Sequence, residues 1–183
     1  MKRIGLFGGT FNPIHIGHIK MAEAARKEYK LDIVYFIPCG IPPHKSKKDL
    51  LPTKVRLELV KKAVRRKKYF KVLDIEIKKC KGLLQQAPNY TIDTILSVRG
   101  MLVTNKNLPN FYFLIGQDEF ENLHTWHKAK ELVKLVTFLV LPRKIKKNKK
   151  KKVRSQILGL RSKLVHTRTI DISSTEVRKG TVN

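Results

Sequence analysis

The chain has 183 residues, of which 42% are hydrophobic, so it can bury one substantial core and is expected to form a single domain. It carries 40 Lys and Arg against 14 Asp and Glu, a formal net charge of +26. No apolar run approaches the length of a membrane span, and no small-residue cleavage site follows Met1-Lys2-Arg3, so neither a membrane segment nor a signal peptide is expected. Cys39 and Cys80 fit no CxxC or zinc spacing, which favours a reduced cytoplasmic setting.

Apolar runs alternate with amphipathic stretches along the chain, which predicts an α/β fold with a doubly wound parallel sheet covered by helices on both faces. The second helix is expected to begin at Pro52-Thr53. Its apolar residues share one side, namely Val55, Leu59, Val60 and Ala63. The predicted strands are 3–8, 33–37, 70–77, 111–115, 136–141 and 165–171, and the predicted helices are about 17–30, 53–67, 91–99, 119–134 and 153–163.

Residues that directly follow the predicted strands are expected to meet at one edge of the sheet. Ligands of such sheets bind beyond the carboxyl ends of the strands, where the strand order changes direction. The residues in these positions are Gly8-Gly9, Pro38, Gly116–Asp118 and Pro142-Arg143.

The segment Gly8–His18, Gly-Gly-Thr-Phe-Asn-Pro-Ile-His-Ile-Gly-His, lies between the first strand and the first helix. A glycine pair permits a tight turn, although it is also typical of an ordinary turn, and the helix start behind it suits a phosphate group. His15 and His18 would donate hydrogen bonds to that phosphate. No third ligand lies near the two histidines, so no metal site is predicted. The segment is neither a P-loop nor a GxGxxG fingerprint.

Further segments follow Gly8–His18 in chain order, namely Pro42-Pro43-His44-Lys45, Asn89–Thr94, Phe113–Asp118 with Leu123 and Trp126, and Ile172–Arg178. Together these segments resemble the nucleotidyltransferase superfamily that carries the (H/T)xGH motif, and most closely its nicotinate-nucleotide adenylyltransferase branch. The resemblance spans residues 4 to 178 and implies one Rossmann-like nucleotidyltransferase domain over 1–183. Leu141-Pro142-Arg143 stands near the family's R-P-G with the order altered, which leaves the role of Arg143 open.

The resemblance implies transfer of the adenylyl group of ATP to nicotinate mononucleotide, which gives nicotinate adenine dinucleotide and pyrophosphate in NAD biosynthesis. The phosphate of the mononucleotide is already an anion, so the in-line reaction needs positioning and charge screening rather than a strong base. By resemblance His18 is the leading catalytic residue, at the α-phosphate, and His15 shares the phosphate site. Mg²⁺ would neutralise the leaving group and be held mainly by ATP and water.

The resemblance also implies an ATP site and a mononucleotide site. Ser173–Glu176 forms a capping box, which either only starts a helix or also binds the β- and γ-phosphates. Asp118 would accept hydrogen bonds from ribose, or else cap the following helix. The implied ATP-binding residues are Gly8, Gly9, Thr10, Phe11, His15, His18, Gly116, Asp118, Ser173, Ser174, Thr175 and Arg178. The implied mononucleotide-binding residues are Lys45, Tyr90, Thr91, Trp126 and His127, with Trp126 stacked on the pyridine ring.

The excess of positive charge also suits a nucleic-acid-binding protein on the same fold. Much of it lies in a lysine-rich loop at about 143–153, which is expected to be solvated because it repels itself and lacks aromatic residues for base stacking. Nucleic acid is therefore not an expected partner. Pantetheine-phosphate adenylyltransferase is the other alternative, and Trp126 and Asn89-Tyr90-Thr91 count against it.

Two properties stay open at this point. The sequence does not fix the oligomeric state, a homo-oligomer included. The chain ends soon after Arg178, whereas members of the family commonly continue through a longer terminal helix, so its end is either natural or truncated.

Overall fold

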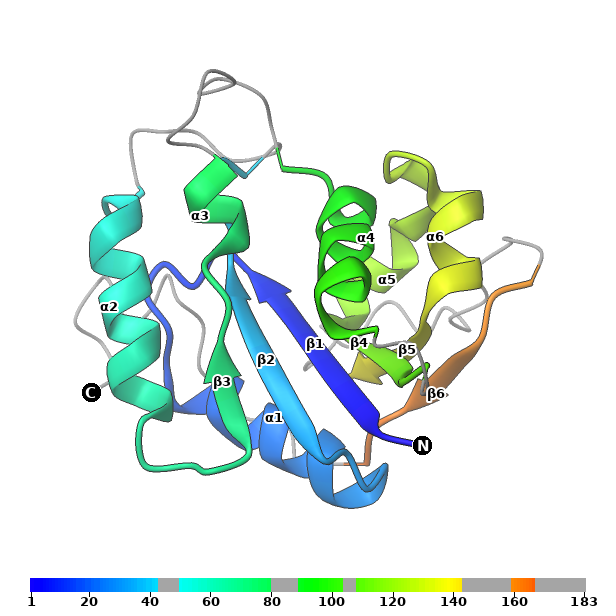
Figure 1. Ribbon diagram of the computed structural model, residues 1–183, viewed down its shortest axis with the longest axis horizontal. Helices are drawn as coiled ribbons and strands as arrows, with labels where there is room; N and C mark the ends of the chain where they lie inside the picture. The colour runs from blue at the N-terminus through cyan, green and yellow to red at the C-terminus, as the bar shows by residue number, and fades with distance from the viewer. Residues whose placement is uncertain (43–49, 80–88, 104–107, 143–158, 167–183) are drawn as a thin grey trace, which may run out of the picture.

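A computed structural model of the chain describes residues 1–42, 50–79, 89–103, 108–142 and 159–166. Six parallel strands form one sheet in the order β3-β2-β1-β4-β5-β6 (Figure 1). This order changes direction between β1 and β4, so the predicted doubly wound sheet is confirmed. The strands are β1 Arg3–Gly9, β2 Ile33–Pro38, β3 Phe70–Val72, β4 Asn110–Gly116, β5 Thr137–Leu141 and β6 Ser162–Leu164. The helices are α1 Ile16–Glu28, α2 Thr53–Val64, α3 Ile75–Lys79, α4 Thr91–Leu102, α5 Gln117–Glu121, the 3₁₀ helix η2 Leu123–Thr125 and α6 Ala129–Leu135.

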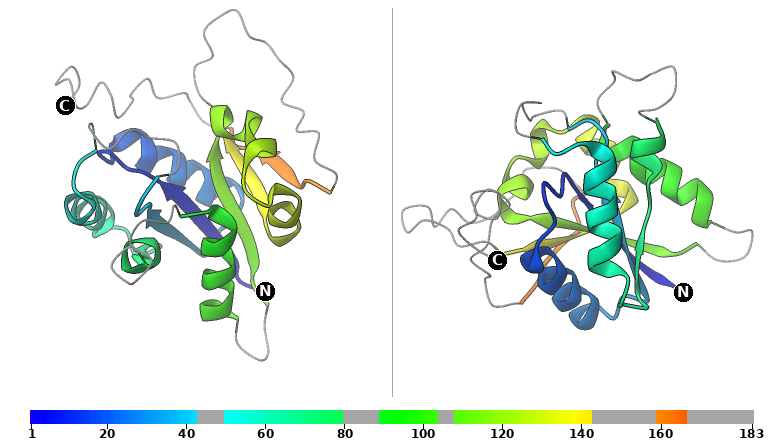
Figure 2. Two further views of the ribbon diagram at one scale, coloured as in Figure 1. Left: turned by 90° about the horizontal axis from the view of Figure 1, so that it is seen from above. Right: turned by 90° about the vertical axis from the view of Figure 1, so that its left-hand side faces the viewer.

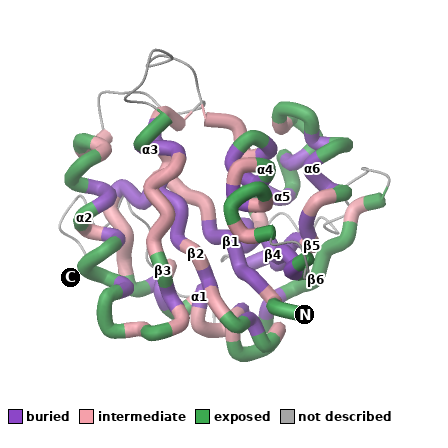
Figure 3. The backbone as a smooth tube through the Cα atoms, viewed as in Figure 1, coloured by how far each residue is buried: buried purple, intermediate pink, exposed green. Residues whose placement is uncertain are grey.

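Successive residues of the central strands point to opposite faces of the sheet, and each face carries its own hydrophobic core. In β4, Phe111, Phe113 and Ile115 pack in the core shared with α4 and α6. Tyr112 and Leu114 pack in the core shared with α1 and α2. Figure 2 shows α1 and α4 on opposite sides of β1, and Figure 3 shows the buried residues concentrated along the sheet. Burial on both faces explains why these strands are continuous apolar runs.

Helix α2 begins at Thr53 after Pro52, as predicted, but of the apolar side named from the sequence only Val60 is buried and Leu59 is half-buried. Val55 is 42% exposed and Ala63 is also exposed. The residues buried on α2 are instead Arg56, Leu57, Val60 and Val64. Leu57, Val60 and Val64 follow the i, i+3, i+7 spacing of one helical face, and Arg56 is buried beside them although an apolar pattern excludes an arginine.

The predicted strand 70–77 and helix 119–134 are each broken in the structure. The strand pairs with β2 only from Phe70 to Val72, and the chain then enters α3. The helix is divided into α5, η2 and α6, and α6 is separated from η2 because Lys128 adopts a left-handed φ of 51° that a helix cannot contain. Trp126 and His127 therefore lie in the turn between η2 and α6, not in a helix.

The last predicted helix and strand are displaced. The predicted helix 153–163 is wrong at its end, because Ser162–Leu164 forms edge strand β6, and its residues 153–158 lie outside the described residues. The predicted strand 165–171 is represented by Val165, whose N–H donates to Val140, and residues 167–171 are outside the described part. All three residues of β6 are exposed, so the strand has no apolar alternation to detect.

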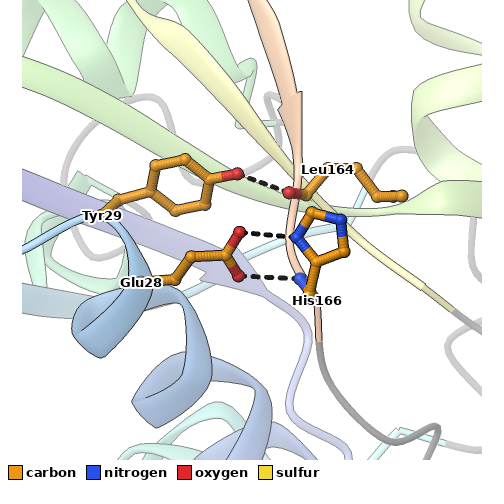
Figure 4. Close-up of polar contacts among 4 residues, drawn as sticks. All are labelled: Glu28, Tyr29, Leu164 and His166. Carbon is orange, nitrogen blue, oxygen red and sulfur yellow. Dashed lines mark hydrogen bonds and ion pairs between the residues drawn. The ribbon is translucent and has the colours of Figure 1, made fainter.

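The end of β6 and the segment after it are hydrogen-bonded to the end of α1 (Figure 4). The Tyr29 hydroxyl donates to the carbonyl of Leu164, and the Glu28 carboxylate accepts the backbone N–H of His166 at 2.7 Å. Partial burial raises the pKa of Glu28, but the interactions with His166 and Tyr29 together outweigh it and hold that pKa below its usual range. The His166 side chain is 80% exposed, so its ion pair with Glu28 contributes less than about 1 kcal/mol to stability.

Within the described residues, no helix combines the length and the apolar character needed to cross a membrane.

Candidate active site

An open cleft of about 700 Å³ lies at the carboxyl ends of β1, β2, β4 and β5. It gathers residues that are far apart in the sequence, as expected at the point where the strand order changes direction. Every predicted site residue that the structure describes lines the cleft, except His15. These residues are Gly8, Gly9, Thr10, Phe11, His18, Tyr90, Thr91, Gly116, Asp118, Trp126 and His127. Lys45, Arg143, Ser173, Ser174, Thr175 and Arg178 lie outside the described residues.

The turn after β1 favours glycine because aromatic rings approach the backbone closely. A Cβ atom on Gly9 would lie 3.1 Å from the ring of Phe11, and one on Gly8 would lie 3.3 Å from the ring of Phe113. Phe11 itself has a left-handed φ of 45°, which costs a non-glycine residue roughly 1–2 kcal/mol. Its buried ring, edge-on to Phe7 at 5.6 Å, offsets that cost by packing. The turn is thus fixed by the core beneath it.

His18 is oriented by contacts on two sides. Its ring is edge-on to Phe11, with the ring centroids 5.2 Å apart, and 3.8 Å from the ring of His15. The backbone N–H of His15 donates to Nδ1 of His18 at 3.2 Å. Because a backbone N–H can only donate, Nδ1 is the acceptor and the neutral ring carries its proton on Nε2. His18 therefore offers an N–H donor at Nε2, and His15 lies beside the cleft in contact with His18.

Aromatic side chains line the part of the cleft formed by the start of α4 and the turn before α6. Tyr90 directly precedes α4, and its ring stacks on His127 at 4.3 Å. Trp126 is half-buried and edge-on to Phe113 at 6.2 Å. Thr91 is the first residue of α4, where backbone N–H groups have no partner within the helix. This region combines flat aromatic surfaces with hydrogen-bond donors.

Asp118 lies in the first turn of α5 and is exposed. The N-cap position of α5 is Gly116, so the alternative that Asp118 caps this helix is wrong. The Asp118 carboxylate is thus placed at the cleft beside Gly116, at the end of β4.

Glu76 and Thr94 also line the cleft, and the sequence did not reveal them. The Thr94 hydroxyl donates to Oε1 of Glu76 at 2.7 Å, and Glu76 is only 7% exposed. Burial raises the pKa of Glu76, while hydrogen bonds from Thr94, the Cys39 thiol and the Gly40 backbone offset part of the rise. Glu76 lies between two isoleucines, so an alternating pattern assigns it to solvent rather than to a buried site.

The raised pKa of Glu76 predicts a specific pH dependence of stability. Folding favours the protonated carboxyl, because its pKa rises from an ordinary value of 4.5. The free energy of unfolding, measured relative to Glu76→Gln, should be highest below pH 4.5 and should fall as the pH rises through the raised pKa. Urea unfolding of both proteins at a series of pH values measures this difference. A difference that grows with pH would contradict the assignment.

The chain is similar to known proteins over almost its whole length. The cytidylyltransferase-like family model matches residues 6–180. A probable nicotinate-nucleotide adenylyltransferase of Dehalococcoides mccartyi is 37% identical over 185 residues, which cover 99% of this chain and 86% of the relative. One of Caldicellulosiruptor bescii is 37% identical over 183 residues, with coverages of 97% and 85%. In the match to another Dehalococcoides mccartyi strain, 41% identical over 141 residues, the chain spans 65% of the relative's length.

Solved structures share the fold. The nicotinic acid mononucleotide adenylyltransferase of Plasmodium falciparum complexed with NaAD superimposes with a TM-score of 0.73 at 19% identity, over 98% of this chain and 83% of that one. The same enzyme complexed with APC gives a TM-score of 0.71 at 18% identity over the same shares of the two chains. The chain therefore belongs to the cytidylyltransferase-like family and, within it, to the nicotinate-nucleotide adenylyltransferases, which are nucleotidyltransferases of NAD biosynthesis.

Proposed function

We propose that the cleft joins ATP and nicotinate mononucleotide into nicotinate adenine dinucleotide, with release of pyrophosphate. One observation carries this proposal: the Gly8–Phe11 turn and His18 share a single cleft with Tyr90, Trp126 and His127. A phosphate site and an aromatic base site thus open into the same space. A cleft of about 700 Å³ falls within the usual range for small-molecule sites.

The reaction needs no covalent intermediate on the protein. An oxygen of the mononucleotide phosphate forms a bond to the α-phosphorus of ATP while the bond from that phosphorus to the α–β bridging oxygen breaks. Nε2–H of His18 donates to a non-bridging oxygen of the α-phosphate, where negative charge must be stabilised. Backbone N–H groups of the Gly8–Phe11 turn and the Thr10 hydroxyl supply further donors. Because the ring and the turn are held by packing, little reorganisation accompanies the reaction.

The mononucleotide lies across the aromatic part of the cleft in this proposal. The pyridine ring stacks on Trp126, and its carboxylate accepts hydrogen bonds from Thr91 at the start of α4 and from the backbone N–H of His127. The stack between Tyr90 and His127 holds that backbone in place. Asp118 accepts from the ribose hydroxyls of the adenosine, and Lys45, Ser173, Ser174, Thr175 and Arg178 complete the two sites as the sequence predicts.

We propose that Mg²⁺ accompanies ATP and neutralises charge on the departing pyrophosphate. Mg²⁺ prefers oxygen ligands and usually keeps several waters. Asp118 and Glu119 are carboxylates in the cleft wall near Gly116, but no three metal-ligating side chains gather in the described residues. The triphosphate and water are therefore proposed as the main ligands. The cytoplasm is the proposed location, because the two cysteines fit no CxxC or zinc spacing.

Pyrophosphate release from ATP and Mg²⁺ tests the proposed function. Nicotinate mononucleotide should support rapid release, and phosphopantetheine or the absence of an acceptor should not. Duplex and single-stranded nucleic acids, added separately, should leave the rate unchanged. Faster release with phosphopantetheine would favour the alternative adenylyltransferase. No release with nicotinate mononucleotide, together with salt-dependent binding of nucleic acid, would replace the proposal by the binding alternative.

A further inference from the structure

Arg56 is a buried cation that holds two loops of the cleft. It lies on α2 and is 1% exposed. Its Nη1 donates to the carbonyl oxygens of Thr10 and Cys39, each at 2.7 Å. Its Nη2 donates to the carbonyl oxygen of Gly40 at 3.0 Å. One side chain therefore ties the phosphate-binding turn after β1 to the segment that follows β2.

The guanidinium is also fixed to the start of its own helix. Nε of Arg56 donates to the carbonyl oxygen of Leu51 at 3.1 Å, and Nη2 donates to the Thr53 hydroxyl at 3.2 Å. The N–H of Leu51 in turn donates to the side-chain oxygen of Asn12 at 2.8 Å, in the turn after β1. The planar fork of arginine supplies these donors at fixed angles, which a lysine cannot do.

Glu76 contacts the same segment after β2, but it accepts hydrogen bonds where Arg56 donates them. Its carboxylate accepts hydrogen bonds from the Cys39 thiol and the Gly40 backbone N–H, as well as from the Thr94 hydroxyl of α4. The dipeptide Cys39–Gly40 thus gives its carbonyl oxygens to a buried cation and its donors to a buried carboxylate. Burial of either charge is tolerated only with such hydrogen bonds. Cys39–Gly40 therefore links Arg56 and Glu76 through hydrogen bonds.

The segment after β2 also reaches the proposed mononucleotide site. The N–H of Ile41 donates to the side-chain oxygen of Asn89 at 2.9 Å, and the N–H of Asn89 donates to the carbonyl of Ile41 at 3.3 Å. Asn89 directly precedes Tyr90 and the start of α4. Contacts therefore run without a gap from the turn after β1, through Arg56 and Cys39–Gly40, to α4.

We infer that Arg56 and Glu76 act as one positioning unit, through Cys39–Gly40. This unit fixes the position of the phosphate-binding turn relative to the start of α4. The inference rests on the proposed function, because this relative position matters if the turn holds ATP and α4 holds the mononucleotide. Neither residue is assigned a contact with the reacting atoms, so both are positioning residues. In-line transfer is sensitive to the relative position of the two substrates, since a displacement of about 1 Å lowers a rate on the order of 100-fold.

A double-mutant cycle in kcat/KM tests the unit. Arg56→Lys keeps the charge but loses the fork, and Glu76→Gln keeps the shape but loses the carboxylate. Arg56→Lys should lower kcat by about 10- to 100-fold and raise the KM of ATP more than that of nicotinate mononucleotide. Glu76→Gln should mainly raise the KM of the mononucleotide. In kcat/KM for the mononucleotide, which both substitutions lower, the double variant should lose much less than the product of the two single losses, because both residues act through Cys39–Gly40.

Arg65→Lys, at the exposed end of α2, is the matched control and should leave all constants unchanged. If the Arg56 variants do not fold, Thr94→Val decides, since it removes the link from Glu76 to α4 with little change of shape. It should raise the KM of the mononucleotide and leave that of ATP unchanged. Two results would overturn the inference. One is a loss in kcat/KM of the double variant that equals the product of the single losses, and the other is an equal change in both KM values for Thr94→Val. An inactive wild-type protein would instead overturn the proposed function.

Discussion

Replacing His18 by Ala is expected to lower kcat by roughly 100-fold or more, the effect of removing one donor from a charge-stabilising site. The hydrogen bond from the His15 backbone to Nδ1 leaves Nε2–H as the proposed donor to the α-phosphate. This donor acts most strongly as charge shifts in the transition state, so the KM of ATP should change much less than kcat. Steady-state pyrophosphate release, with circular dichroism to verify the fold, measures both.

Two further variants sharpen this prediction. His18→Gln keeps an N–H donor near the position of Nε2 and should retain more of kcat than His18→Ala. His166→Ala removes an exposed histidine near the other end of α1 and serves as the matched control, with wild-type kcat expected. Near-normal turnover in a folded His18→Ala protein would remove His18 from its catalytic role.

Nicotinate mononucleotide is expected to exceed nicotinamide mononucleotide in kcat/KM by on the order of 10-fold or more, because a buried donor left without its partner costs about 1–3 kcal/mol. The proposed donors are Thr91 at the start of α4 and the backbone N–H of His127. The positive field of a chain with net charge +26 favours the same carboxylate. Equal kcat/KM for the acid and the amide would contradict this account of specificity.

Trp126 gives that site a direct signal, since it is the only tryptophan of the chain. Stacking of the pyridine ring should quench its fluorescence in a saturable way. Trp126→Ala should raise the KM of the mononucleotide far more than that of ATP, and Trp126→Phe, which keeps an aromatic face, should recover part of the loss. Unchanged mononucleotide KM in a folded Trp126→Ala protein would place the base elsewhere.

The sequence predicted the strands of the sheet best where both faces are buried. β4 and β5 are continuous apolar runs because alternate side chains enter two different cores, and their bounds agree with the prediction to within a residue. The Gly8–His18 turn was also predicted correctly, and its glycines suit the close approach of the Phe11 and Phe113 rings. Local pattern and tertiary requirement coincide at these positions.

Where tertiary contacts override the local pattern, the sequence was misleading. The break at Lys128 is hidden in a stretch with helical composition, yet it delivers Trp126 and His127 to the cleft. Arg56 and Glu76 lie at positions that a hydrophobicity pattern assigns to solvent. Their burial depends on backbone groups of Thr10, Cys39 and Gly40, which only the folded chain brings together.

A crystal structure of the chain with nicotinate adenine dinucleotide bound tests the proposed site most directly. We expect the adenosine phosphate within hydrogen-bond distance of Nε2 of His18, next to the Gly8–Phe11 turn. We expect the pyridine ring on Trp126, with its carboxylate at the start of α4. A dinucleotide whose phosphates lie away from His18, or whose pyridine ring lies outside the cleft, would contradict the proposed function.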